Sequence, residues 1–124
     1  MKEYDNKIPI YLQIMAQMKI SIASGALSAG EKLSSVRELA QAFEVNPNTM
    51  QRALAELERE NLFFTERTSG RFVTTDEGVI MNLRDTLAEQ EINRFMSYME
   101  QIGYTKQEMI QKIQQWQKER KHNG

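Results

Sequence analysis

The chain opens with apolar residues at the spacing of an amphipathic helix. After Pro9 an apolar residue recurs at every fourth position from Ile10 to Ile22, which predicts a helix that begins behind the proline. Gly25 follows at a position where glycine commonly ends helices. Residues 26–33 are then predicted as a short link to the next element.

Two further short helices follow, each with its own start signal. Ser35 and Glu38 have the Ser-x-x-Glu spacing of a capping box, which predicts a helix of about two turns. Asn46 then offers an N-cap, and Pro47 a first helical position, for a third helix. The apolar face of this third helix consists of Met50, Ala53, Leu54 and Leu57.

Beyond the third helix the periodicity changes twice. Residues 62–65 and 71–75 are β-prone and flank a polar tip with Gly70, which predicts a hairpin. From Asp76 a helical pattern returns and runs to Gly103, and Thr105 with Glu108 opens a last helix with a second capping box. The apolar stripe of the long helix comprises Val79 or Ile80, Leu83, Leu87, Ile92, Phe95, Met99 and Ile102.

This order of elements predicts a mainly α fold with a small β-hairpin. Three helices and a hairpin have the plan of a winged helix-turn-helix domain, expected at residues 8–76, and two further helices occupy residues 77–124. Phe63 and Phe64 are adjacent, so a strand sends them to opposite faces. We therefore expect one of them to be partly exposed or covered by the C-terminal helices.

The composition limits the kinds of functional site that the chain can form. The chain has no Cys and a single His, His122, so disulfides, Cys-based zinc sites and cysteine nucleophiles are excluded, and histidine chemistry has little support. No run approaches about 18 apolar residues, and the first residues form no secretory signal. We expect a cytoplasmic protein without enzymatic activity, metal or cofactor.

Motifs spread over residues 9–73 resemble a known family. They are Pro9-Ile10-Tyr11-x-Gln13-Ile14, Gly25-x-Leu27-x-x-Gly30-x-x-Leu33, Ser35-x-Arg37-Glu38-Leu39-Ala40, Val45-Asn46-Pro47-Asn48-Thr49, Ala53-x-x-x-Leu57-Glu58 and Gly70-x-Phe72-Val73. Together they resemble the GntR family of bacterial transcription regulators over roughly residues 8–76, and the short C-terminal part resembles its YtrA subfamily. Ser34 stands where the family has Pro, and Asn61 where it has Gly; asparagine also tolerates the left-handed conformation expected at that position.

The resemblance implies a partner and a mode of action. It implies a sequence-specific regulator of transcription that binds double-stranded DNA, as a homodimeric repressor on an inverted-repeat operator. Its expected targets are neighbouring genes, often a transporter operon, together with its own gene. In the family motif, Arg37 matches an arginine that reaches DNA; the alternative is a surface pair with Glu38 or Gln41.

The third helix has the polarity of a recognition helix. It carries no acidic residue from Val45 to Ala55, whereas base edges are contacted from the N-terminal part of such helices. Asn and Gln pair with adenine and Arg with guanine, although an ordinary amphipathic helix would also have a polar outer face. The candidate DNA-binding residues of the helical part are Ser35, Arg37, Asn46, Asn48, Thr49, Gln51 and Arg52, with Ser35 first of all a cap.

The hairpin tip supplies a second set of candidates. Two arginines around small residues suit contact with the sugar–phosphate backbone or the minor groove, while Glu66 opposes it and a merely solvated turn is the alternative. Lys7 could add a phosphate contact. The tip candidates are Arg67, Thr68, Ser69, Gly70 and Arg71.

Bulk charge gives no support to DNA binding. Residues 1–75 hold nine basic and nine acidic groups, so the argument depends on where the charges lie. A winged-helix adaptor that binds protein is therefore the alternative function, and an enzyme is a distant third. Salt dependence of binding separates the first two.

The C-terminal region is expected to dimerise. Two amphipathic helices cannot bury their apolar stripes alone, so a second copy is favoured over a monomer with the helices folded back. An effector could lodge among Phe95, Tyr98, Met99, Tyr104 and Trp116, although no convergent polar groups mark a pocket there. The expected dimer interface consists of Leu83, Leu87, Phe95, Met99, Ile113 and Trp116.

Overall fold

The computed structural model describes residues 3–123, and side chains as far as residue 120. Two compact units divide between Arg84 and Asp85, inside the long helix. No helix among the described residues combines the length and the apolar character needed to span a bilayer. The fold class predicted from the sequence is the one observed: mostly helices with a two-stranded antiparallel hairpin.

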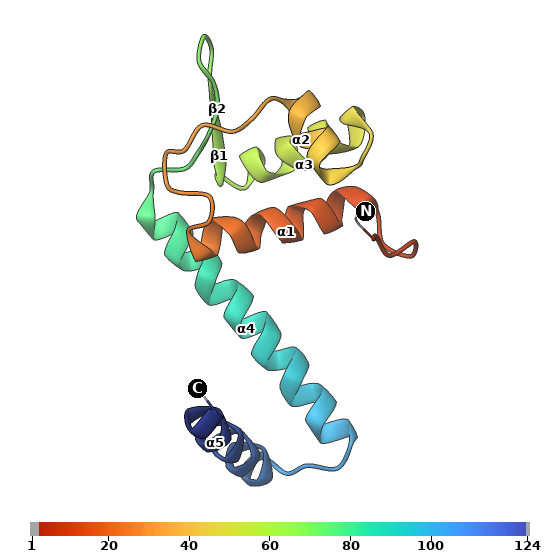
Figure 1. Cartoon of the computed structure of the whole chain (residues 1–124), viewed down its shortest axis with the longest axis vertical. Helices are drawn as coiled ribbons and strands as arrows, with labels where there is room; N and C mark the ends of the chain where they lie inside the picture. The colour runs from red at the N-terminus through yellow and green to blue at the C-terminus, as the bar shows by residue number, and fades with distance from the viewer. Residues whose placement is uncertain (1–2, 124) are drawn as a thin grey trace. The chain divides into compact units, whose positions relative to one another are not determined.

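The first unit begins with a three-helix core. The helix α1 (Ile10–Ser24) buries Ile14, Met15, Met18 and Ile22, and Gly25 ends it in the left-handed region at φ 86°. The helices α2 (Val36–Phe43) and α3 (Pro47–Arg59) follow, joined by a turn in which Glu44 is left-handed at φ 56°. Figure 1 shows α1 packed beneath the pair of α2 and α3.

The start signals act as the sequence predicts. The Ser35 hydroxyl accepts a hydrogen bond from the Glu38 N–H, and the Glu38 carboxylate accepts one from the Ser35 N–H. The Asn46 side chain caps α3 by accepting from the Asn48 N–H at 2.7 Å. These caps satisfy amide groups that the first turn of a helix leaves without partners.

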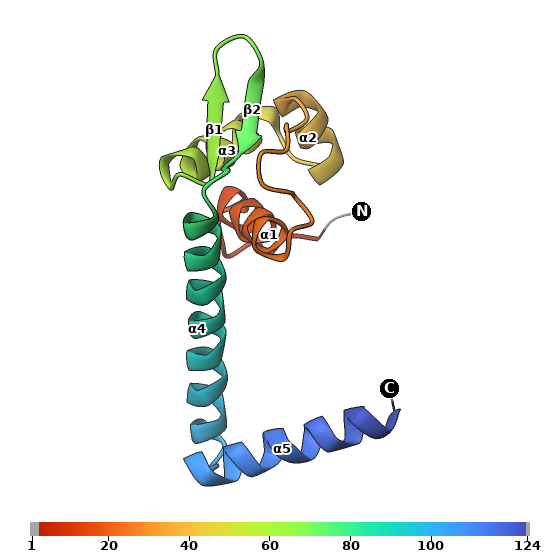
Figure 2. The ribbon, with the colours of Figure 1, turned by 90° about the vertical axis from the view of Figure 1, so that its left-hand side faces the viewer.

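The wing is an antiparallel hairpin of β1 (Phe63–Glu66) and β2 (Gly70–Val73), which extends from the helices (Figure 2). The link predicted before α2 adds to it: Lys32 bridges Phe72, and the Leu33 N–H donates to the Arg71 carbonyl at 2.9 Å. The link thus flanks β2 as a third, strand-like segment. The sequence shows no alternation there that could have predicted it.

The two adjacent phenylalanines separate as expected. Phe63 is 2 % exposed in the core, and Phe64 is half-buried on the other face of the strand. Phe64 stacks on Phe72 across the hairpin, with ring centroids 5.5 Å apart. Its apolar partner therefore comes from the wing itself.

The C-terminal helices are α4 (Glu77–Gln101) and α5 (Lys106–Asn123). The first turns of α4 belong to the first unit, where Leu83 is only 8 % exposed. The rest of α4 and α5 form the second unit. Gly103 separates the two helices at φ 99°, and the Thr105–Glu108 capping box opens α5, as predicted.

Candidate nucleic-acid interface and the α4–α5 groove

The N-terminal part of α3 presents polar groups to solvent. Asn48 and Gln51 are exposed and Thr49 is half-buried, and none of their side chains has a partner among the described residues. Asn46 differs, because its side-chain oxygen is already engaged as the cap. The helix N-terminus adds partial positive charge, so this end of α3 offers free donors and acceptors where an anionic ligand is favoured.

Arg52 is held in place by α1. Its guanidinium lies over the Tyr11 ring, 3.9 Å from the centroid, and Nη2 donates to the Tyr11 hydroxyl at 3.3 Å. A guanidinium has five N–H donors, so others remain for a base or a phosphate. The sequence named Tyr11 only as part of a family motif and gave no signal that it contacts α3.

Arg37 is exposed at the start of α2. The alternative that it pairs with Glu38 or Gln41 is not what the structure shows: no ion pair or hydrogen bond of Arg37 occurs within the described residues. The Glu38 carboxylate is used in the capping box, and these bonds, first the one from the Ser35 backbone, lower its pKa. Arg37 lines a hollow of about 540 Å³ together with Asn46 and Pro47, beside the N-terminus of α3.

The tip of the wing is open to solvent. Arg67, Thr68 and Ser69 are exposed, and Arg67 makes no ion pair within the described part of the chain. Gly70 is required by the backbone, since its φ is 114° and an added Cβ would lie 3.3 Å from the Lys32 side chain. A hollow of about 560 Å³ lies between this hairpin and the segment that leads into α2.

Arg71 does not share the exposure of Arg67. Its Nε donates to a Glu58 carboxylate oxygen at 3.1 Å, and its side chain is only 19 % exposed. The same oxygen accepts a hydrogen bond from the Thr65 hydroxyl at 2.6 Å. The Thr65 hydrogen bond and then Arg71 lower the pKa of Glu58, while burial acts in the opposite direction. The sequence analysis named Glu58 only as part of a family motif and missed this contact.

A family model described as "Bacterial regulatory proteins, gntR family" matches residues 10–73. The chain belongs to the GntR family. It is 37% identical over 111 residues to the uncharacterized HTH-type transcriptional regulator YhcF of Bacillus subtilis, covering 90% of this chain and 92% of YhcF. It is 36% identical over 115 residues to the HTH-type transcriptional repressor YtrA of the same organism, covering 90% and 83%.

Solved structures of GntR regulators resemble this GntR protein. A GntR family transcriptional regulator from Listeria monocytogenes superposes with a TM-score of 0.84 at 40% identity, covering 90% of this chain and 98% of that one. The AraR DNA-binding domain in complex with operator ORR3 superposes with a TM-score of 0.52 at 26% identity, covering 60% and 87%. The chain is a DNA-binding transcriptional regulator, and its relatives are regulators rather than enzymes.

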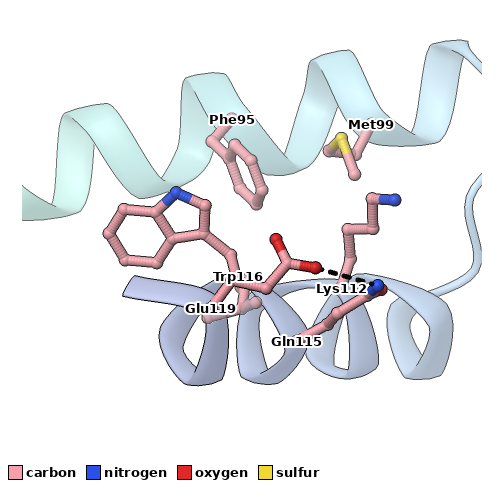
Figure 3. Close-up of a pocket in the computed structure, with 7 residues that line it drawn as sticks. Phe95, Met99, Lys112, Gln115, Trp116 and Glu119 are labelled. Atoms are coloured by element: carbon pink, nitrogen blue, oxygen red, sulfur yellow. Dashed lines mark hydrogen bonds between the residues drawn. The ribbon is translucent and has the colours of Figure 1, made fainter. Parts of the chain in front are cut away.

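In the second unit of this GntR regulator, α4 and α5 enclose an open groove of about 590 Å³. Figure 3 shows Phe95 and Met99 of α4 facing Trp116 of α5 across it. Ile113, Lys112 and the hydrogen-bonded pair Gln115 and Glu119 complete the lining.

The predicted interface residues differ in the exposed fraction of their side chains. Leu83 and Met99 are 8 % and 9 % exposed, so the single chain already buries them. Leu87 and Phe95 are half-buried, whereas Ile113 is 47 % and Trp116 59 % exposed. Of the residues considered for an effector, Phe95, Met99 and Trp116 line the groove, and Tyr98 and Tyr104 do not.

Proposed function

We propose that the protein is a homodimeric repressor that binds an inverted-repeat operator, one half-site to each chain, in the cytoplasm. Its targets are its own gene and a neighbouring operon, such as one for a transporter. The relative YtrA is named a repressor and aligns over most of this chain, which supports the direction of regulation.

The first unit supplies two kinds of DNA contact in this proposal. Asn48, Gln51 and Arg52 contact base edges in the major groove, because they are exposed near the N-terminus of α3. The other free groups contact phosphates and fix the register. The phosphate-contact residues are Arg37, Thr49, Arg67, Thr68 and Ser69. Ser35, Asn46 and Gly70 shape the surface as caps and a turn.

The observation that carries the dimer is the apolar α4–α5 groove. Exposed Ile113 and Trp116, with half-buried Phe95, leave an apolar surface that water contacts in the single chain. A second copy of the same unit covers this surface in an isologous pair. Twofold symmetry then matches the two DNA-binding units to two inverted half-sites.

Selection from a random duplex library with the full-length protein tests this proposal. We expect two inverted copies of one half-site whose centres lie about one helical turn, or a multiple of it, apart. Inserting about five base pairs between them should abolish tight binding, whereas about ten should restore part of it. A selected motif with one unrepeated half-site contradicts the symmetric arrangement.

A reporter fused to the gene's own promoter tests the direction of regulation. We expect reporter expression to rise when the gene is removed and to fall when it is restored. A Gln51→Ala copy serves as the matched control, because it keeps the fold while losing a base contact. Lower expression after removal of the gene contradicts a repressor.

A further inference from the structure

A single carboxylate joins the recognition helix to both strands of the wing. Glu58 projects from the last turn of α3, and one of its oxygens accepts from the Thr65 hydroxyl of β1 at 2.6 Å and from Arg71 Nε of β2 at 3.1 Å. Thr65 and Arg71 are cross-strand partners in the hairpin. The bonds therefore converge from neighbouring positions on one face of the wing.

The contact lies at the base of the wing tip. The next pair in the register is Glu66 with Gly70, and the exposed tip residues 67–69 follow at once. A two-stranded hairpin is only marginally stable by itself, so its direction depends on what its base contacts. Charge-assisted hydrogen bonds from both strands restrict that direction more than a single bond does.

The two wing arginines also differ in whether a carboxylate balances their charge. Arg71 is 19 % exposed and its charge is balanced by Glu58, whereas Arg67 has no ionic partner among the described residues. Arg67 is therefore the freer of the two for a phosphate, because Glu58 already balances the charge of Arg71.

We propose that Glu58, Thr65 and Arg71 form a positioning clamp that fixes the wing on the recognition helix, so that Arg67 meets the DNA backbone in register with α3. Glu58 and Arg71 act through Arg67 and do not touch the DNA. This clamp rests on the proposed operator contacts of the wing and assigns a role to an acidic residue in a DNA-binding unit.

The clamp and plain electrostatics predict opposite signs for Glu58→Ala. Removing a carboxylate reduces repulsion of phosphates and releases Arg71, so electrostatics alone tightens binding. Loss of the clamp weakens binding, because Arg67 no longer meets its phosphate in a fixed place. We expect operator affinity of the full-length protein to fall roughly five- to tenfold, a size typical of coupled residues.

Glu56→Ala is the matched control. Glu56 lies on the same helix and loses the same charge, but its partner is Arg59, 3.5 Å away on the surface of α3. Operator affinity of this variant should stay unchanged or rise slightly. Thr65→Val removes only the hydroxyl donor and keeps a β-branched strand residue. It should weaken operator binding, as Glu58→Ala should, and it keeps the test valid if Glu58→Ala folds poorly.

A double-mutant cycle with Arg67→Ala identifies the route of the effect. In the wild-type background the loss of Arg67 should cost about tenfold in affinity, and in the Glu58→Ala background less than about twofold. An equal cost in both backgrounds, or Glu58→Ala binding as tightly as wild type, overturns the clamp.

Backbone order parameters of residues 67–69 in the free protein give a readout that needs no DNA. They should fall in Glu58→Ala, from about 0.85 toward about 0.6, and stay high in Glu56→Ala. Unchanged values overturn the clamp whatever the affinity shows. A wild-type chain that binds no operator contradicts the proposed function, and the order parameters still decide the clamp.

Discussion

Polar residues of the DNA-binding unit differ in whether their side chains already have a partner within the chain. The side chain of Asn46 caps α3 and that of Arg71 bonds to Glu58. The side chains of Asn48 and Gln51 have no partner within the described residues. The sequence names all four as polar residues near the interface and identifies Asn46 as a cap, because a cap is a local contact. It does not separate Arg71 from the others, because the bond of Arg71 to Glu58 joins the wing to α3.

Tyr11→Phe separates two ways in which Tyr11 holds Arg52. It removes the 3.3 Å hydrogen bond and keeps the ring under the guanidinium. Arg52→Ala should cost about 1–3 kcal/mol per half-site in operator binding with loss of preference at one base pair. Tyr11→Phe should cost less, about 0.5–1 kcal/mol, and relax the same base pair. Fluorescence anisotropy with base-substituted operators measures both.

Tyr98→Phe is the control, because Tyr98 is an exposed tyrosine of the second unit. Its operator affinity should equal that of wild type. Tighter binding by Tyr11→Phe would show that Tyr11 competes with DNA for Arg52 and would contradict the positioning role.

Glu58 predicts a pH dependence of stability. Its pKa is lowered in the folded state, first by the Thr65 hydrogen bond, so its contribution is present above the unfolded pKa and disappears as pH falls through the folded pKa. The difference in free energy of unfolding between wild type and Glu58→Gln should therefore be largest near neutral pH and shrink below about pH 4. Urea unfolding at several pH values checks this, and a difference that grows on acidification disagrees with it.

At the scale of elements, capping signals were the most accurate guide. The Ser35–Glu38 and Thr105–Glu108 boxes, the Asn46 cap and Gly25 all mark observed helix ends. Such signals act within a few residues, so the sequence contains them directly. The strand-like link at 30–33 was missed because its hydrogen bonds go to β2, about forty residues later.

Asn61 tests the turn from α3 into the wing. It is left-handed at φ 66°, where the family normally has glycine. Asn61→Gly should leave the free energy of unfolding within about 0.5 kcal/mol, whereas Asn61→Ala should lower it by about 1 kcal/mol, because alanine tolerates this region poorly. Thermal or urea unfolding compares the two variants. An alanine variant as stable as the glycine variant contradicts a conformational reason for asparagine here.

At the scale of the whole molecule, the change of pattern at Asp76 did not coincide with the boundary of the compact units. The unit that holds the DNA-binding surface continues to Arg84, since Leu83 is buried in it. Periodicity reveals where a helix begins, but it does not show which of its turns pack on the preceding domain.

Fragments of the chain check this boundary. A fragment of residues 1–84 should fold cooperatively as a monomer, and one ending at Thr75 should be less stable by about 2 kcal/mol or more, because it loses the buried Leu83. Urea unfolding followed by circular dichroism measures the difference. Equal stability would show that the first turns of α4 add nothing to the DNA-binding unit.

In the proposed assembly, two chains joined through the α4–α5 groove bind one operator. Sedimentation of full-length protein over a concentration series, alone and with an operator duplex, tests this assembly. We predict a dimer and two chains per duplex. Both should be lost in Ile113→Asp, where a charge enters an apolar interface, and both should be kept in Ile20→Asp, which changes an exposed apolar residue of α1 outside the groove. A full-length protein that remains monomeric at high concentration and still binds the inverted repeat tightly would contradict the dimer.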